Sequence, residues 1–215
     1  MHHPKATSGE QPDHIQAEKA AARRLARAEW ERLASDGPRR EAIMSRWAEW
    51  LKQRAADAAS EVLEVSMAGE GRLLAYLPFG TELDPGTKPL ESFAAVGRLY
   101  MPRTGPGGAM DFRRFAPGDP IVPGHYGVPG PSPEAPALDL PLGPADLVLV
   151  PGLAANAAGV RLGRGGGYYD RWRDELERGT VVGLLPQALA NLEFSGAAHD
   201  IRYHCIITEH GPLRR

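Results

Sequence analysis

The chain has 215 residues, and its 25 lysines and arginines nearly balance 27 aspartates and glutamates, for a formal net charge of −2 at pH 7. With 42% hydrophobic and 24% charged residues, the composition is that of an ordinary globular protein and excludes a wholly disordered chain. The near-neutral charge argues against a general nucleic-acid-binding protein, whose phosphate contacts need a basic excess. A single cysteine, Cys205, excludes an intramolecular disulfide framework and a cysteine-rich zinc site, and its apolar neighbours predict a buried thiol.

The N-terminal residues and the hydropathy pattern bear on location. No apolar stretch approaches the ~20 residues needed to span a bilayer, and residues 1–5 lack the apolar core of a signal peptide. We therefore expect a cytoplasmic, monomeric protein with no membrane or nucleic-acid partner. Residues 1–14 are polar and without periodicity, which predicts a frayed N-terminus ahead of a single domain over residues 15–215.

Two helices are predicted at the start of this domain. Apolar residues recur near the helical period over residues 15–34 and again over 39–60, and Asp36-Gly37-Pro38 separates the two segments. The second segment carries an apolar stripe that we interpret as core packing rather than as a stacking platform for a ligand, formed by Ile43, Trp47, Trp50 and Leu51.

Shorter elements are predicted in the middle of the chain. Strands are expected over residues 72–77 and 99–102, a helix over 89–96 and an edge strand over 110–115. Residues 117–145 contain nine of the 20 prolines, so we expect a long irregular loop without regular elements there.

The C-terminal third alternates strands with a helix. Residues 146–151 form an apolar run of the kind that parallel sheets bury on both faces, and a glycine-rich loop and a helix over 167–177 are expected after it. Further strands are predicted over 181–185 and 203–208, the latter as the last strand. Strands that alternate with helices predict an α/β domain with a parallel or mainly parallel sheet.

The strongest chemical signal is the segment Arg161-Leu-Gly-Arg-Gly-Gly-Gly-Tyr-Tyr-Asp170. Four glycines within five residues allow successive backbone N–H groups to point into one concavity. A loop between a strand and a helix also presents the helix N-terminus to an anion. Arg161 and Arg164 add planar, permanently charged donors that suit phosphate oxygens. The segment is neither a Walker A loop nor a dinucleotide fingerprint, and the alternative is a sharp turn with incidental arginines.

Several other polar residues gain meaning beside this loop. Asp170 offers a hard carboxylate oxygen to Mg²⁺, or it stabilises the first turn of a helix. Lys19 and Arg23 are four residues apart on one helix face, where a solvated surface is the alternative. Glu82 follows a predicted strand as a polar anchor for an apolar pocket. His199-Asp200 precedes the last predicted strand, where an ordinary turn aspartate is the more common explanation.

Residues 146–152 and the glycine loop closely resemble the signature of the 5-formyltetrahydrofolate cyclo-ligase family, also called 5,10-methenyltetrahydrofolate synthetases. The resemblance extends from the helix that bears Lys19 and Arg23 to Ile206-Ile207-Thr208-Glu209. It implies a three-layer, single α/β domain with a mainly parallel sheet, helices on both faces and two helices before it. The implied reaction is the ATP- and Mg²⁺-dependent conversion of 5-formyltetrahydrofolate to 5,10-methenyltetrahydrofolate, with release of ADP and phosphate.

The resemblance also implies roles for individual residues by motif position. Lys19 and Arg23 would contact the ATP phosphates, and Lys19 and Arg164 would be catalytic, with Arg164 stabilising the transferred phosphoryl group. Asp170 and Asp200 would bind Mg²⁺. The ATP loop would comprise Arg161, Leu162, Gly163, Arg164, Gly165, Gly166, Gly167, Tyr168 and Tyr169. Glu82 would bond the amino-pyrimidine edge of the pterin, and the implied folate contacts are Leu77, Glu82 and Tyr168.

The sequence departs from the family pattern on the folate side. Gly130 stands where relatives commonly carry glutamate in Gly-Ile-x-Glu-Pro, Ala155-Asn156 stands where they often carry Phe-Asp, and the proline-rich loop is unusually long. These departures favour a reshaped folate pocket with retained chemistry. They leave open a non-catalytic nucleotide- or folate-binding protein. An RNA-associated protein that uses the Arg-Gly-Gly segment is a poorer alternative, because the charge is near neutral and no aromatic platform is present.

Overall fold

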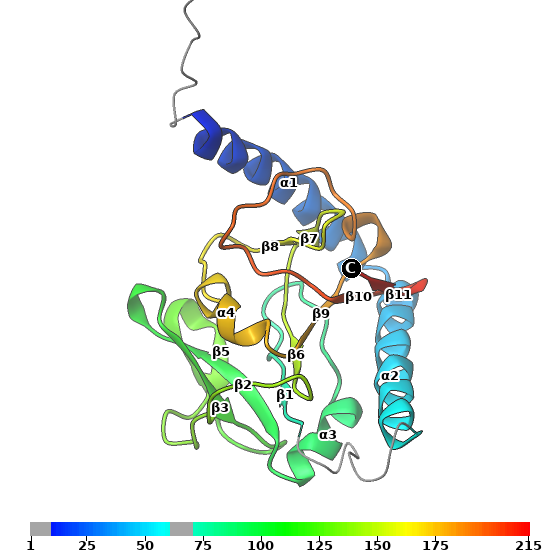
Figure 1. Ribbon diagram of the computed structural model, residues 1–215, viewed down its shortest axis with the longest axis vertical. Helices are drawn as coiled ribbons and strands as arrows, with labels where there is room; N and C mark the ends of the chain where they lie inside the picture. Colours follow the sequence, from blue (N-terminus) through cyan, green and yellow to red (C-terminus); the bar gives the residue numbers. More distant parts are fainter. Residues whose placement is uncertain (1–9, 61–70) are drawn as a thin grey trace, which may run out of the picture.

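The computed structural model describes residues 10–60 and 71–215 (Figure 1). Its centre is a seven-stranded sheet in the order β11 (Gly211–Arg214), β10 (Cys205–Thr208), β9 (Thr180–Leu184), β6 (Leu147–Leu149), β1 (Leu73–Leu74), β2 (Leu99–Thr104) and β3 (Met110–Arg114). The five strands from β10 to β2 are parallel, and the two edge strands β11 and β3 are antiparallel to their neighbours. The predicted mainly parallel sheet and the predicted edge strand near residue 110 are therefore confirmed.

Helices cover both faces of this sheet. The connection from β1 to β2 contains α3 (Thr87–Ala95), and the connection from β6 to β9 contains α4 (Arg173–Leu176). The first connection leads toward the β3 edge of the sheet and the second toward the β11 edge. Because both crossovers are right-handed, α3 and α4 lie on opposite faces. Helix α2 (Gly37–Ser60) packs along β10 and β11, on the other side of the sheet from α4 in Figure 1. Every residue of β6 and of β10 is buried as a result.

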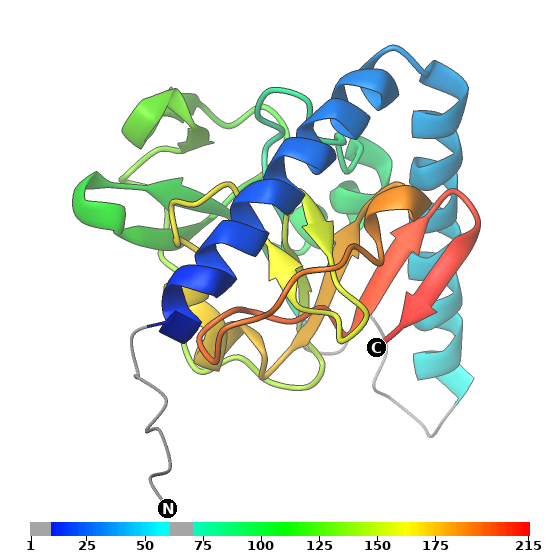
Figure 2. The ribbon, with the colours of Figure 1, turned by 90° about the horizontal axis from the view of Figure 1, so that it is seen from above.

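The N-terminal helix α1 (Glu10–Ala34) crosses over a small hairpin of β7 (Ala154–Ala155) and β8 (Arg161–Leu162), as Figure 2 shows. The helix begins at Glu10, earlier than the predicted residue 15, and residues 1–9 of the predicted frayed start lie outside the described residues. Trp30 Nε1 fixes the crossing by donating a hydrogen bond to the Leu153 carbonyl at 2.9 Å. This crossing brings one face of α1 over the glycine loop that follows β8.

The apolar stripe of α2 confirms the predicted core packing. Ile43 and Trp47 are fully buried, and Leu51 is nearly so. Trp50 is partly buried and stacks on Trp47 with ring centroids 5.8 Å apart.

Cys205 is buried as predicted, and burial raises the pKa of its thiol to about 11. In the described part of the chain, no helix combines the length and apolar character that a membrane span requires.

The predicted helix over residues 167–177 is confirmed only in part. The segment holds a 3-10 turn, η3 (Asp170–Trp172), and then only the single turn of α4. Trp172 joins the two with a φ of −99° and a ψ of 3°, and its indole packs edge-on against Phe112 with ring centroids 5.3 Å apart and donates a hydrogen bond to the Met110 carbonyl at 2.9 Å. Among the described residues, the segment after the glycine loop therefore begins as a 3-10 turn at Asp170 and becomes α-helical only for one turn.

Two further expectations are corrected. Residues 203–208 are not the last strand, because β11 follows after a tight turn at Gly211, whose φ of 121° suits glycine. The proline-rich segment is not wholly irregular either. It contains the hairpin β4 (Ile121–Pro123) and β5 (Pro129–Pro131), where a side chain on Gly130 would meet the Pro102 carbonyl at 2.9 Å. The remaining turns are η1 (Pro106–Gly108), η2 (His125–Gly127) and η4 (Gln187–Leu189).

Asp146 joins the start of β6 to the start of β1. Its Oδ1 accepts hydrogen bonds from the backbone N and the Nε of Arg72, and its Oδ2 accepts bonds from Arg72 Nη2 and the Gly143 N–H. Burial by itself would raise the pKa of Asp146, but these bonds and the Arg72 charge outweigh burial and lower it. The charged carboxylate therefore stabilises the folded state above its ordinary pKa.

We predict that Asp146→Asn lowers the free energy of unfolding by about 3 kcal/mol at pH 7, since it leaves a largely buried guanidinium without its counter-ion. Because the folded-state pKa is the lower one, this stabilisation is lost as the pH falls through and below the carboxyl's ordinary 3.8. Urea unfolding at pH 7 and pH 3 measures both effects. Asp174→Asn, whose side chain is 87% exposed, is the control and changes stability by less than ~0.5 kcal/mol. A variant difference that does not shrink at pH 3 would contradict the assignment.

Candidate functional site

Two cavities meet at the glycine loop. The first, about 390 Å³ in volume, is lined by charged and small residues, and we call it the polar cavity. The second, about 330 Å³, lies over the ends of β1, β2 and β6 and is lined mainly by aromatic and apolar residues, so we call it the apolar cavity. Three residues line both cavities, and they are Arg161, Gly163 and Gly167. The loop therefore forms the wall between two spaces of opposite chemical character.

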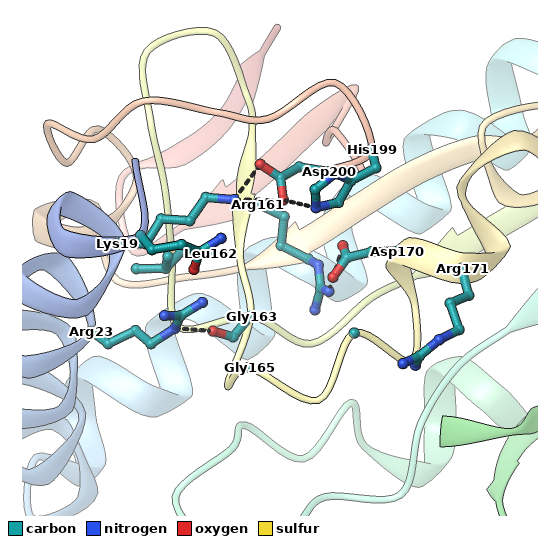
Figure 3. Close-up of a pocket in the computed structure, with 12 residues that line it drawn as sticks. Lys19, Arg23, Arg161, Leu162, Gly163, Gly165, Asp170, Arg171, His199 and Asp200 are labelled. Atoms are coloured by element: carbon teal, nitrogen blue, oxygen red, sulfur yellow. Dashed lines mark hydrogen bonds and ion pairs between the residues drawn. The ribbon is translucent and has the colours of Figure 1, made fainter. Parts of the chain in front are cut away.

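One side of the polar cavity comes from α1. Lys19 and Arg23 lie on the helix face that crosses the loop, as their spacing predicts, and Figure 3 shows both beside the loop. Lys19 is buried and its Nζ lies 2.7 and 2.5 Å from the two carboxylate oxygens of Asp200. Arg23 Nε donates a hydrogen bond to the Gly163 carbonyl at 3.0 Å. The helix thus supplies one paired cation and one cation bonded only to a neutral carbonyl.

Asp200 reaches this cavity from an unexpected side. It precedes β10 and so belongs to the amino end of that strand, but an antiparallel bridge between Val160 and Arg202 brings its segment alongside β8. The Asp200 Oδ2 also accepts a hydrogen bond from the Ala197 N–H at 2.6 Å, while His199 stays exposed with its Nε2 3.9 Å from Asp200. The family resemblance implied Asp200 as a site residue, but its position at the cavity depends on the bridge between Val160 and Arg202.

Arg161 is the central cation of the site. It is buried, its Nη1 donates to the Pro151 carbonyl at 2.9 Å, and its Nη2 contacts Asp170 Oδ1 at 3.0 Å. Its guanidinium also lies over the Tyr169 ring, 5.3 Å from the centroid. Burial by itself would raise the pKa of Asp170, but the charge and hydrogen bond of Arg161 outweigh burial and lower it. Asp170 is therefore anionic at neutral pH.

The two carboxylates differ in their fitness for a metal ion. Asp170 uses Oδ1 for Arg161 and for a long contact of 3.4 Å from the Ile201 N–H, while its Oδ2 has no hydrogen-bond partner among the described residues. Both oxygens of Asp200 are engaged by Lys19. No group of three or more metal-binding side chains occurs within residues 10–60 and 71–215. The donor set fits Mg²⁺ only in its usual form, with one carboxylate oxygen, water and ligand phosphates.

The apolar cavity holds one carboxylate, Glu82, on the segment after β1. The Phe79 N–H donates to Glu82 Oε2 at 3.0 Å, and Arg164 Nε lies 3.2 Å from Oε1. Burial raises the pKa of Glu82, and the Phe79 bond and the Arg164 charge only partly offset this effect. Arg40 of α2 holds the backbone of the same segment through the Thr81 and Glu82 carbonyls, at 3.3 and 3.0 Å.

The predicted loop residues divide between the cavities. Leu162 and Gly165 line the polar cavity, whereas Gly166, Tyr168, Tyr169 and Arg164 line the apolar one, together with the predicted Leu77. Arg164 therefore lies on the Glu82 side of the loop and not among the cations of the polar cavity. Its side chain is 46% exposed, and its Nη2 also contacts the Phe79 carbonyl at 3.3 Å.

Three of the lining residues that the sequence analysis did not single out are informative. Gln16 lies three residues before Lys19 on the same face of α1, so helical spacing alone would have found it. Arg171 follows Asp170 directly and lines the polar cavity, and its nearness to the predicted metal ligand could have marked it. Tyr126, 80% exposed at the mouth of the apolar cavity, takes a φ of 57° that nothing in its neighbourhood predicts.

The departures from the family pattern have structural explanations. Asn156 closes the β7–β8 turn, since its Oδ1 accepts bonds from the Ala158 and Val160 N–H groups and its Nδ2 donates to the Phe194 carbonyl. It lines neither cavity. Gly130 is buried against β2 next to Val128 and Pro129, which do line the apolar cavity. The missing carboxylate therefore concerns only the apolar cavity.

Comparison with known proteins agrees with this architecture. The chain is similar to 5-formyltetrahydrofolate cyclo-ligases of Mycolicibacterium smegmatis, at 37% identity over 45% of this chain and 52% of that protein, and of Escherichia coli, at 32% identity over 62% and 72%. The first alignment thus spans about half the length of its relative.

Solved structures show the same fold. An Aquifex aeolicus 5,10-methenyltetrahydrofolate synthetase superposes with a TM-score of 0.66 at 23% identity, covering 91% of this chain and 92% of that one. A Mycoplasma pneumoniae synthetase superposes with a TM-score of 0.61 at 17% identity, covering 89% and 99%. The model of the 5-formyltetrahydrofolate cyclo-ligase family matches residues 15–185, which include most of α1, the residues that line the apolar cavity and the whole glycine loop. The chain belongs to the 5-formyltetrahydrofolate cyclo-ligase family.

Proposed function

We propose that the protein converts 5-formyltetrahydrofolate to 5,10-methenyltetrahydrofolate at the expense of ATP, which becomes ADP and phosphate. The observation that carries the proposal is the pair of cavities on either side of one glycine loop. The polar cavity suits a polyphosphate, and the apolar cavity with its single carboxylate suits a flat heterocycle that carries hydrogen-bond donors. A shared wall lets the terminal phosphate of one ligand approach the other ligand.

The chemistry explains why two adjoining cavities are needed. The N5-formyl group is an amide, so its carbon is a poor electrophile and its oxygen a poor leaving group. In the proposed reaction the formyl oxygen bonds to the γ-phosphorus of ATP while the bond from that phosphorus to the bridging oxygen breaks and ADP leaves. N10 of the folate then bonds to the activated carbon, the N10 proton passes to phosphate or water, and the C–O bond breaks to release phosphate.

The residues around the polar cavity would position the phosphates. Lys19 and Arg23 would contact them from α1, and the loop from Arg161 to Gly167 would surround them with backbone N–H groups and the Arg161 charge. Asp170 Oδ2 would bind Mg²⁺, which supplies charge neutralisation on the phosphates when bound. Asp200 is the second carboxylate that the family resemblance implies, and its bond to Lys19 supports a role in holding that ammonium in place.

On the other side of the loop, Glu82 would accept hydrogen bonds from the amino-pyrimidine edge of the folate, with Leu77 and Tyr168 in contact with its ring system. Arg164 would lie between Glu82 and the reacting groups, where its charge would stabilise the phosphoryl group during transfer. Proximity of two bound ligands, rather than a strong acid or base, would supply most of the acceleration.

The direct test mixes the full chain with 5-formyltetrahydrofolate, ATP and Mg²⁺ and follows the near-ultraviolet absorbance of the methenyl product. The proposal expects a rise that requires all three components. A flat trace, beside a relative of proven activity that gives a rise, would contradict it and favour a protein that binds these ligands without turnover. Calorimetric titration with ATP and folate would then identify which cavity is still filled.

We predict that Glu82→Gln raises the folate KM at least tenfold at pH 7 and changes the ATP KM less than twofold. In the parent protein, burial raises the pKa of Glu82. The charged carboxylate therefore lowers the free energy of unfolding at neutral pH, and this loss of stability develops as the pH rises through the raised pKa. The variant should therefore melt no lower than the parent, and the parent's folate affinity should fall as the pH drops toward that raised pKa. Equal effects on both KM values would show that the cavity is misassigned.

Separate substitutions of Asp170 and Asp200 distinguish a carboxylate that binds Mg²⁺ from one that positions Lys19. Asp170→Asn should raise the Mg²⁺ concentration for half-maximal rate at least tenfold and lower the melting temperature, because buried Arg161 loses its counter-ion. Asp200→Asn should instead raise the ATP KM by loosening Lys19, with the Mg²⁺ requirement unchanged. Equal shifts in the Mg²⁺ requirement for both variants would make Asp200 a second metal ligand and contradict its assignment as the partner of Lys19.

Arg164→Ala tests stabilisation of the transferred phosphoryl group. We expect kcat to fall by about two to three orders of magnitude, the effect of one lost preorganised donor, with a smaller rise in the folate KM from the lost Glu82 contact. Single-turnover measurements with saturating ligands separate the two effects. If kcat falls less than tenfold while the folate KM rises strongly, Arg164 serves only to hold Glu82.

A further inference from the structure

The polar cavity carries more positive charge than its ion pairs neutralise. Among its described lining residues are four cationic and two anionic side chains, a formal charge of +2. The two carboxylates are consumed by Lys19 and Arg161, each in a buried or largely buried ion pair. The two cations left over are Arg23 and Arg171, which contact only backbone carbonyls in the part of the chain that the structure describes. The attraction of this cavity for anions therefore rests on these two arginines.

Arg171 occupies a slot that two glycines create. A side chain on Gly108 would meet Arg171 Nη1 at 2.4 Å, and one on Gly167 would meet it at 3.5 Å. Both glycines have a positive φ, 78° and 65°, and belong to segments far apart in the sequence, the β2–β3 turn and the glycine loop. The guanidinium thus lies between two backbone segments, and a larger residue at position 108 would displace it from this position.

The hydrogen bonds of Arg171 leave most of its donors available. Nη1 alone contacts the protein, with the Gly166 carbonyl at 3.1 Å and the Gly108 carbonyl at 3.3 Å, and both contacts are long for a charged donor. Over residues 10–60 and 71–215, Nε and Nη2 of this side chain have no hydrogen-bond partner. Figure 3 shows Arg171 on the opposite side of the cavity from Arg23, with the glycine loop between them.

We propose that Arg171 is a phosphate-binding residue, which faces Arg23 across the polar cavity and holds the oligophosphate of a nucleoside triphosphate between the two guanidinium groups. The identification of the oligophosphate as that of a nucleotide rests on the proposed function. Arg171 is exposed, but its contacts with two backbone carbonyls already restrain its guanidinium beside the cavity, so part of the side-chain entropy is lost before a phosphate binds. The carbonyls of Gly166 and Gly108 hold the side chain in the cavity before the ligand arrives.

The test uses inorganic tripolyphosphate as the probe, titrated calorimetrically into the full chain and its variants. Arg171→Gln keeps hydrogen-bonding capacity but removes the charge, and should weaken binding about tenfold or more. Arg171→Lys keeps the charge but loses the planar set of donors, so it should bind more weakly than the parent and more tightly than Arg171→Gln. Arg178→Gln is the matched control, because Arg178 lies on the surface nearby with a side chain 57% exposed and outside the cavity, and it should bind like the parent.

Several outcomes would overturn the inference. Parent-like binding by Arg171→Gln, equal losses in the Gln and Lys variants, or no binding of tripolyphosphate to the parent chain would each do so. In the folate assay, Arg171→Gln should raise the ATP KM about tenfold and leave the folate KM unchanged. If tripolyphosphate binding depends on the Arg171 charge but no methenyl product forms, the inference stands and the proposed function fails. If product forms and the variant binds tripolyphosphate normally, only the inference fails.

Discussion

The buried guanidinium of Arg161 is the constraint around which both cavities are arranged. A buried charge is tolerated only when it is paired and hydrogen-bonded, and here Asp170 supplies the counter-charge and the Pro151 carbonyl a further acceptor. The neighbouring backbone must also come close. A side chain on Gly152 would meet Arg161 Cγ at 3.1 Å and the Tyr203 hydroxyl at 2.3 Å, and one on Gly163 would meet Arg161 Nη2 at 3.0 Å. Gly152 and Gly163 are thus needed to make room for the Arg161 side chain, whether or not a ligand is bound.

One atom of this arginine remains unsatisfied. Arg161 Nε is buried and has no hydrogen-bond partner among the described residues. Such a group costs free energy in the unliganded protein. Arg161 is also one of the three described residues, with Gly163 and Gly167, that line both cavities. Glu82 presents a parallel case, because burial raises its pKa and so works against its charged form. The site therefore stores unfavourable electrostatics on each side of the loop, as is common where a protein is shaped for a ligand rather than for stability.

The sequence predicted the parts of this arrangement that follow local rules. The face of α1 with Lys19 and Arg23 follows from helical spacing, and the buried parallel strand β6 follows from its apolar run. Nothing local predicts that the expected helix is divided between a 3-10 turn and one α-helical turn around Trp172, which packs on Phe112, or that β11 pairs with β10 across a tight turn. Those outcomes depend on contacts between segments far apart in the chain, which periodicity does not report.

The difference between local patterns and tertiary contacts also explains why the net charge of the whole chain says little about the ligand. A chain with a formal net charge of −2 carries +2 in its polar cavity, because acidic residues lie elsewhere on the surface while two of the cavity's four cations keep no carboxylate partner. In a cavity walled by protein, a charge acts through a lower effective dielectric than at an open surface, so a local excess of two charges outweighs a distant deficit. Under the proposed function, recognition of a phosphorylated ligand thus depends on which charges are paired within this one cavity. That pairing depends on the Val160–Arg202 bridge that brings Asp200 to Lys19, and on the two glycines that admit Arg171.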